Sequence, residues 1–237
     1  MKASKSVVTA RITEIFSSVQ GEGSRMGERQ VFIRFESCHM ECAYCDEGSK
    51  LGRAMSLPDV LKEVSRIEKS HGPHRVVSLT GGEPLLQAGF LKCLCRELKR
   101  KQFRILLETS GVLWKSFSKV VRDCDIIAMD LKLSSVTRQR CFLEEHRKFL
   151  GLVKTKDSYI KVVVSPKICQ AEYEKHIRMV ASVAPRMTVY LQPLSCGKTA
   201  FPRPLLIHLL LRLQRIGAKW LPNIRLGIQL HKLINVR

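Results

Sequence analysis

The chain has 237 residues, 45% of them hydrophobic, so it is long enough to bury one substantial core. Its 41 Lys and Arg residues outnumber 21 Asp and Glu residues, and the formal charge of +20 favours nucleic acid, acidic proteins or anionic small molecules as partners. Because the N-terminus lacks the apolar stretch of a signal peptide and no segment is long enough to span a bilayer, we expect a cytoplasmic protein.

Short β-rich runs alternate with segments of helical period from Gln30 onward, which is the pattern of a parallel sheet covered by helices. Several runs are continuous in Val, Ile and Leu, as expected for strands covered on both faces. The expected strands are residues 31–35, 76–79, 104–108, 126–131, 159–164, 188–192 and 224–229. The expected helices are one that begins at a capping box at Ser56 and others over 84–101, 112–122, 143–150, 170–183 and 204–216. Because no repeat or linker interrupts this order, we predict one α/β domain over residues 1–237.

Three of the nine cysteines lie close together in the run Cys38-His-Met-Glu-Cys42-Ala-Tyr-Cys45, just after the first expected strand. A loop between a strand and a helix would present them at the carboxyl edge of the sheet. Three thiolates this close can ligate one 4Fe-4S cluster. Because such a cluster usually takes four cysteines, this loop would leave one iron open to another group.

Zinc is the main alternative metal, with His39 as a conceivable fourth ligand. His39 is adjacent to Cys38, however, which makes tetrahedral ligation by both residues awkward, and structural zinc usually takes a second cysteine pair. The only other close pair, Cys93-Leu-Cys95, lies in a helical pattern, where we expect buried cysteines. The spacing therefore favours a cluster, and the odd number of cysteines disfavours a disulfide framework.

The Cys-x-x-x-Cys-x-x-Cys spacing, with Tyr44 before the last cysteine, resembles the radical S-adenosylmethionine (radical SAM) superfamily, and Thr80-Gly-Gly-Glu83 is similar to its Gly-Gly-Glu motif. Within the superfamily, the chain resembles the 7-carboxy-7-deazaguanine synthases. The resembling segments are residues 16–23, 32–35, 38–46, 80–87, 108–111, 130–132, 161–164, 191–193 and 229–233. The resemblance implies a single-domain partial (β/α) barrel of the radical SAM type with mostly parallel strands, an N-terminal substrate loop at 16–24 and a cluster loop at 38–47.

Site roles follow from the same resemblance, position by position. It implies that Cys38, Cys42 and Cys45 form the catalytic core and hold the 4Fe-4S cluster. The implied positions that bind S-adenosyl-L-methionine are Gly82, Glu83, Asp130, Leu131, Lys132, Gln192, Pro193, Leu194 and Ser195. The implied substrate-binding positions are Val19, Gln20, Gly21, Glu22, Arg34 and Thr80. Glu47 stands where the family usually has a threonine that touches Mg²⁺, so it is the expected ligand of that ion. Ser110 stands where many relatives carry asparagine.

The activity that the resemblance implies is that of a ring-contracting lyase of queuosine biosynthesis. Such an enzyme converts 6-carboxy-5,6,7,8-tetrahydropterin to 7-carboxy-7-deazaguanine with loss of ammonia. The cluster and S-adenosyl-L-methionine would supply the radical that abstracts hydrogen from the pterin. The expected partners are therefore this small-molecule pterin, an acidic electron donor such as flavodoxin, and a second copy in a homodimer.

Two other functions stay open at the level of sequence. A radical SAM activase, which forms a glycyl radical on a partner protein, shares the cysteine loop and the Gly-Gly-Glu segment, although residues 20–23 and His231-Lys232 favour the lyase. A basic RNA-binding protein with a structural metal is prompted by the charge of +20. Nucleic acid is possible as a partner but is not favoured.

Overall fold

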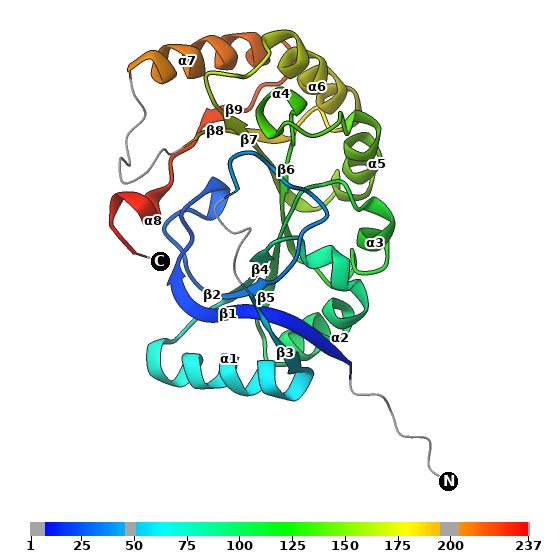
Figure 1. Ribbon diagram of the computed structural model, residues 1–237, viewed down its shortest axis with the longest axis vertical. Coiled ribbons are helices and arrows are strands. Elements are labelled where there is room, and N and C mark those ends of the chain that lie inside the picture. The colour runs from blue at the N-terminus through cyan, green and yellow to red at the C-terminus, as the bar shows by residue number, and fades with distance from the viewer. Residues whose placement is uncertain (1–7, 46–50, 195–203, 237) are drawn as a thin grey trace.

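The computed structural model describes residues 8–45, 51–194 and 204–236. Their strands form one sheet in the order β3-β1-β2-β4-β5-β6-β7-β8-β9. The sheet curves around an interior, and the helices lie along its outer face (Figure 1). In this part of the chain, no helix combines the length and the apolar character that a membrane crossing requires.

From β2 to β9 every neighbouring pair of strands is parallel, which confirms the predicted α/β fold with mostly parallel strands. The seven predicted strands are all present, although the last ends at Leu226 rather than at Gln229. The strands are β1 (Thr9–Val19), β2 (Arg29–Phe35), β3 (Arg53–Ser56), β4 (Val76–Gly81), β5 (Arg104–Thr109), β6 (Ile126–Asp130), β7 (Asp157–Val164), β8 (Thr188–Pro193) and β9 (Ile224–Leu226).

Two antiparallel strands at one edge, β1 and β3, were missing from the prediction. The expected substrate loop at 16–24 is partly wrong, because β1 extends to Val19 and only the residues from Gln20 onward form a loop. Phe16 of β1 stacks on Phe32 of β2, with ring centroids 5.2 Å apart. Only Thr9 to Ile12 of β1 pair with β3, so the rest of β1 lies at the edge of the sheet. Polar and apolar residues are mixed along β1 because it is covered less completely than the parallel strands, so it lacks their continuous apolar run.

The helices are α1 (Leu57–His71), α2 (Ala88–Arg100), α3 (Trp114–Ser118), α4 (Ser134–Thr137), α5 (Leu143–Val153), α6 (Gln170–Val183), α7 (Pro204–Ala218) and α8 (Leu230–Leu233), with 3₁₀ turns η1 (Gly23–Arg25) and η2 (Pro84–Gln87). The capping box at Ser56 is present, since the Ser56 side chain accepts from the Asp59 backbone and the Asp59 carboxylate accepts from the Ser56 backbone. The predicted helix over 84–101 divides into η2 and α2, and the one over 112–122 shortens to α3.

Alternate residues of each parallel strand face opposite layers. Residues such as Leu107 and Ile127 belong to the main core, which the helices cover. Residues such as Leu106 and Tyr159 form a second, smaller apolar cluster with four other strand residues. Polar side chains follow on the same strands toward their carboxyl ends, as Glu108 does on β5, and this change from apolar to polar residues positions the site.

Candidate active site

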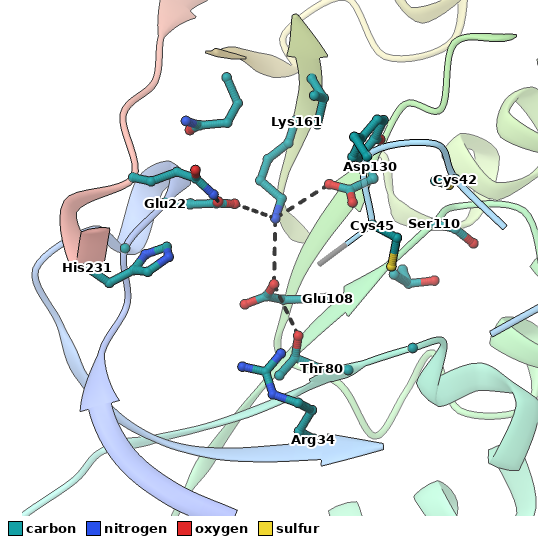
Figure 2. A pocket seen from close by; sticks show the side chains of 18 of the residues that line it. Glu22, Arg34, Cys42, Cys45, Thr80, Glu108, Ser110, Asp130, Lys161 and His231 are labelled. Carbon is teal, nitrogen blue, oxygen red and sulfur yellow. Dashed lines mark hydrogen bonds and ion pairs between the residues drawn. The ribbon is translucent and has the colours of Figure 1, made fainter. Parts of the chain in front are cut away.

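A cavity of about 540 Å³ opens at the carboxyl ends of the strands, a size typical of small-molecule sites. All six predicted substrate positions line it, together with the three cysteines of the cluster loop. Of the predicted cofactor positions, those in the lining are Gly82, Asp130, Lys132, Gln192, Pro193 and Leu194. Glu83 and Leu131 are not in the lining, and Ser195 and Glu47 lie outside the described residues. Figure 2 shows the labelled lining residues converging from strands, loops and a helix that are widely separated in the sequence.

The cluster loop follows β2 and carries Cys38, Cys42 and Cys45, none of which forms a disulfide. Cys45 N donates to Cys42 O at 3.0 Å, so the last two cysteines flank a tight turn. Burial raises the pKa of the Cys38 and Cys42 thiols, and a bound metal would displace those protons. Since the described lining offers three thiols and no fourth, the donor set fits a cluster with one open iron rather than a closed structural zinc site.

Gly81 and Gly82 allow two loops to approach each other closely. Gly82 N donates to Phe35 O at 2.9 Å, and Glu83 N donates to Ser37 O at 2.8 Å. A Cβ atom on Gly82 would lie 2.0 Å from Ser37 O, and one on Gly81 would lie 2.2 Å from Phe35 O. The Gly-Gly pair therefore positions the start of the cluster loop against the end of β4.

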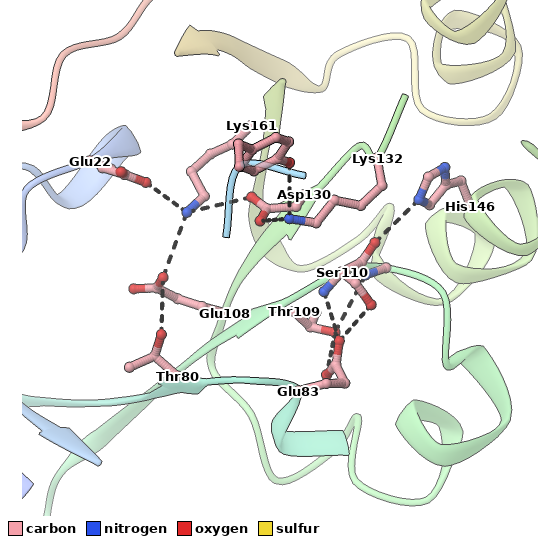
Figure 3. A network of polar contacts seen from close by, with 12 residues as sticks. Glu22, Thr80, Glu83, Glu108, Thr109, Ser110, Asp130, Lys132, His146 and Lys161 are labelled. Carbon is pink, nitrogen blue, oxygen red and sulfur yellow. Dashed lines mark hydrogen bonds and ion pairs between the residues drawn. The ribbon is translucent and has the colours of Figure 1, made fainter. Parts of the chain in front are cut away.

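Glu83 is fully buried beneath the cavity and is occupied by protein donors (Figure 3). Its carboxylate accepts from Thr109 Oγ1 at 2.9 Å, from Ser110 N at 2.9 Å and from Ser110 Oγ at 2.5 Å. It also accepts from Leu85 N at 3.2 Å and caps η2. The Ser110 hydroxyl thus has a defined partner, which the sequence alone did not reveal.

Lys161 lies at the centre of the polar wall, between three carboxylates (Figures 2 and 3). Its Nζ atom is 2.8 Å from Glu22 Oε2, 3.5 Å from Asp130 Oδ1 and 3.6 Å from Glu108 Oε2. Its side chain is only 9% exposed. Sequence analysis gave neither Lys161 nor Glu108 a role, although each is a charged residue that interrupts an apolar strand, and that interruption was the available signal.

Further hydrogen bonds fix the carboxylates around Lys161. Glu108 accepts from Gln20 Nε2 at 2.9 Å, and the hydroxyls of Ser78 and Thr80 also donate to it, at 3.3 and 3.4 Å. Gln229 Nε2 donates to Glu22 Oε1 at 2.7 Å. Residues from both ends of the chain therefore meet in one network.

A second ion pair joins Lys132 Nζ to Asp130 Oδ2 at 2.8 Å, and Lys132 also donates to the Tyr44 hydroxyl at 3.4 Å. Burial by itself would lower the pKa of Lys132, but Asp130 raises it well above its ordinary value. Burial raises the pKa of Tyr44 to about 12, so its hydroxyl stays protonated. Lys132 is consequently a permanent cation beside the cluster loop.

The carboxylates of Glu22 and Asp130 remain ionised although they are buried. Burial raises the pKa of each, but Lys161 beside Glu22, and Lys132 with Lys161 beside Asp130, outweigh it and lower both values. Burial also acts against protonation of Lys161, and the three carboxylates outweigh it and raise its pKa. Glu22, Asp130 and Lys161 are thus charged throughout the neutral pH range.

The stabilisation that this network provides should therefore fall in acid. For Glu22, whose folded pKa lies below its ordinary 4.5, the contribution is complete above that value and is lost as the pH falls through the folded pKa. Denaturant unfolding measures the free energy of unfolding of wild type and of Glu22→Gln. The difference between the two values should become smaller as the pH falls from about 6 to about 3. Glu144→Gln, at an exposed carboxylate, is the control. A difference between wild type and Glu22→Gln that stays the same over this pH range would contradict the expectation.

The N-terminal loop is joined to the C-terminal helix α8. Leu230 N donates to Gly21 O at 2.9 Å, and a Cβ atom on Gly21 would lie 1.8 Å from Nδ1 of His231. Arg34 faces the cavity from β2, where its Nε donates to Glu14 Oε1 at 2.7 Å and its guanidinium lies 5.5 Å from the Phe16 ring centroid. Gln20 and Gly21, which are both buried, are thereby positioned in the lining of the cavity by contacts distant in sequence.

Comparison with known proteins agrees with this geometry. Residues 32–163 match the model of the radical SAM superfamily. A 7-carboxy-7-deazaguanine synthase from Geobacter sulfurreducens is 33% identical, over 95% of this chain and 97% of the relative. One from Methanopyrus kandleri is 30% identical, over 94% and 93%.

Among solved structures, QueE from Escherichia coli superposes with a TM-score of 0.64 at 21% identity, over 94% of this chain and 95% of that one, which supports the shared fold. The superfamily implies a 4Fe-4S cluster and S-adenosyl-L-methionine as cofactors. On the full-length identities, this chain belongs to the 7-carboxy-7-deazaguanine synthase family of the radical SAM superfamily.

Proposed function

We propose that this enzyme converts 6-carboxy-5,6,7,8-tetrahydropterin to 7-carboxy-7-deazaguanine with loss of ammonia. The observation that supports it most directly is that the three cysteines share one cavity with the polar residues of the N-terminal loop and with Arg34. A radical generated at the cysteines would therefore form beside the substrate groups. The relatives that match nearly the whole chain bear the name of this activity, which favours it over an activase or an RNA-binding protein.

The cofactor half of the cavity would lie along the strand ends next to the cysteines. We propose that Cys38, Cys42 and Cys45 hold the 4Fe-4S cluster, and that Gly82, Asp130, Lys132 and residues 192–195 hold S-adenosyl-L-methionine. When bound, these cofactors together supply the 5′-deoxyadenosyl radical. The Asp130 carboxylate offers acceptors for hydroxyl groups, and Lys132 offers a fixed positive charge. We propose that Glu83 and Leu131 complete this cofactor site, with Glu83 held in place by its hydrogen bond from Ser110 N.

The substrate half of the cavity would use the N-terminal loop and the inward residues of β2, β4 and β5. A pterin ring presents an amino group and ring N–H groups, which match the carboxylate acceptors of Glu22 and Glu108. The substrate carboxylate suits the planar donor fork of Arg34. Lys161 would hold the carboxylates of Glu22 and Glu108 in place, so that these acceptors are preorganised before the substrate binds.

A magnesium ion is a further part of the proposal. Glu47 is a hard oxygen donor of the kind that Mg²⁺ takes, and it lies two residues after Cys45. We propose that it binds Mg²⁺ next to the substrate carboxylate. Product formation should then depend on added Mg²⁺, and Glu47→Gln should weaken that dependence while leaving the iron content unchanged.

Two protein partners belong to the same proposal. The cluster must be reduced, and the charge of +20 suits an acidic electron donor such as flavodoxin, whose rate of docking should fall as salt increases.

A homodimer is supported by exposed apolar side chains on α7, namely Leu205, Ile207 and Leu211, which are 85%, 41% and 45% exposed. Sedimentation equilibrium of wild type and Leu205→Lys tests the dimer.

The decisive experiment on the reaction is anaerobic reconstitution with iron and sulfide, followed by incubation with S-adenosyl-L-methionine, a reductant and carboxytetrahydropterin. Mass spectrometry should detect the deazaguanine product together with ammonia. Cleavage of S-adenosyl-L-methionine without any pterin product would point to another radical SAM substrate. Steeply salt-dependent RNA binding without cofactor cleavage would favour the nucleic-acid alternative instead.

Replacement of Gly21 by alanine should weaken substrate binding more than it weakens the fold. The added Cβ atom would collide with His231, so the loop and α8 must separate in the lining of the cavity. We expect KM for the pterin to rise by about tenfold or more, with little change in iron content. Gly89→Ala is the matched control, because its Cβ atom in α2 would meet nothing within 4 Å. Equal KM values in wild type and Gly21→Ala would contradict this role for the contact.

A further inference from the structure

A second group of potential metal ligands lies outside the barrel interior. A sulfur of Cys141, a carboxylate oxygen of Glu172 and a ring nitrogen of His176 all lie within 4.8 Å of one another. Cys141 stands just before α5, and Glu172 and His176 are one turn apart on α6, so they share a face of that helix. The helices α4, α5 and α6 lie on the outer side of the sheet (Figure 1). None of the three residues lines the active-site cavity.

His176 is oriented as a metal ligand would be. Its Nδ1 lies 2.8 Å from the backbone oxygen of Glu172, and because a carbonyl only accepts, Nδ1 carries the proton. The lone pair of the neutral ring is therefore on Nε2. The residue is fully buried, and Nε2 has no hydrogen-bond partner among the described residues. An unsatisfied buried acceptor destabilises the fold, and a bound cation would relieve that cost.

The other two ligands are also suitably held. The Glu172 carboxylate accepts from Ser134 N at 2.7 Å, from Ser134 Oγ at 2.6 Å and from Ser135 N at 3.0 Å, so it is fixed at the start of α4. Burial raises the pKa of Glu172, but these hydrogen bonds outweigh it and lower the value, which keeps the carboxylate ionised. Cys141 is exposed and gives an ion a path from solvent.

We propose that Cys141, Glu172 and His176 bind a zinc ion, with water as the fourth ligand. One thiolate, one imidazole and one carboxylate are all zinc ligands, and the thiolate disfavours Mg²⁺ and Ca²⁺. In a tetrahedral zinc site the ligand atoms are about 3.3–3.8 Å apart, given bonds of about 2.0–2.3 Å. Because the three ligand atoms all lie within 4.8 Å of one another, closing to this geometry requires each pair to approach by at most about 1–1.5 Å.

Zinc at this place would brace the wall behind the cluster loop. Ala43 N donates to Thr137 O at 3.0 Å, and Gln139 Nε2 donates to Glu41 O at 2.9 Å. Phe142, the neighbour of Cys141, packs with Met40 and Cys42. The ion would join this supporting segment to α6. Its loss should therefore loosen the cluster loop without removing any ligand of the cluster.

The test uses the full chain with its cluster assembled, after dialysis against a weak chelator. Elemental analysis should find about one zinc per chain beside the iron. Zinc-edge X-ray absorption, which does not see iron, should show one sulfur and otherwise nitrogen or oxygen neighbours. Cys141→Ser and His176→Gln should lower the zinc content at least about tenfold, whereas Cys169→Ser, an exposed thiol at the start of α6, should not.

A second readout is the rate at which iron is lost to a chelator, which should be faster in Cys141→Ser than in Cys169→Ser, with equal starting iron content. The inference is overturned if dialysed wild type lacks zinc, if Cys141→Ser retains it, or if the zinc has three sulfur neighbours, which would place it on the cluster cysteines. Should His176→Gln fail to fold, the exposed Cys141→Ser variant decides the question. The result is independent of the proposed reaction, because zinc is counted directly.

Discussion

Replacement of Cys42 by alanine is expected to abolish cluster assembly and, with it, product formation. With two thiolates left in the loop, the cluster would lose one of its three protein ligands. Removal of a group that only supports a metal ligand usually lowers activity by about 10–100-fold, so removal of the ligand itself should lower product formation by more than about 100-fold. Iron, acid-labile sulfide and the visible absorption of the reconstituted protein measure the cluster. Mass spectrometry measures the deazaguanine.

The matched control for this loss is Cys93→Ala, because Cys93 is an exposed thiol on α2 that does not line the cavity. It should keep full iron content and activity. Retention of four iron atoms and of activity by Cys42→Ala would remove the cysteine loop from the proposed chemistry. Zinc bound at the loop in place of iron and sulfide would do the same.

The second large effect is expected for Lys161→Met. The change leaves Glu22, Asp130 and Glu108 without their shared cation, and an uncompensated buried charge typically costs about 3–5 kcal/mol. For a chain of this length, this corresponds to a fall in Tm of roughly 6–20 °C. Activity should fall as well, because the acceptors of Glu22 and Glu108 would no longer be held in place.

Denaturant unfolding of the reconstituted protein measures the change in stability. Lys167→Met is the control, because Lys167 is exposed on the loop after β7 and should change stability by less than about 0.5 kcal/mol. Lys161→Arg keeps the charge with a different donor geometry, so it should recover part of the stability and less of the activity. Wild-type stability in Lys161→Met would mean that the three carboxylates do not depend on this cation.

The sequence determined those features that depend on local periodicity and spacing. Continuous apolar runs marked the parallel strands β4, β5, β6, β7 and β8, because such strands are covered on both faces and have little polar content. Helix α6 was predicted at its observed bounds, since its apolar residues recur on one face. The three cysteines were found because their spacing is local, and the resemblance supplied their chemical role.

Edge elements were less visible to the same reasoning. The strand β1 alternates polar with apolar residues and pairs with β3, which is separated from it by the whole cluster loop. Only the pairing with β2 and β3 makes it a strand, so its last residues, up to Val19, were assigned to a loop. The prediction that Cys93 is buried was likewise wrong, since its side chain is exposed. A helical pattern alone does not say which face of the helix the neighbouring elements cover.

Tertiary structure alone decided the electrostatics of the site. Glu22, Glu108, Asp130 and Lys161 lie on four separate segments, and only the assembly of the curved sheet brings them within hydrogen-bonding or ion-pairing distance. The same holds for Glu83, whose partners Thr109 and Ser110 stand 26 and 27 residues further along the chain. Charge interactions depend on distance and burial, which are set by long-range packing, so a pattern of residues along the chain carries the identity of the groups but not their partners.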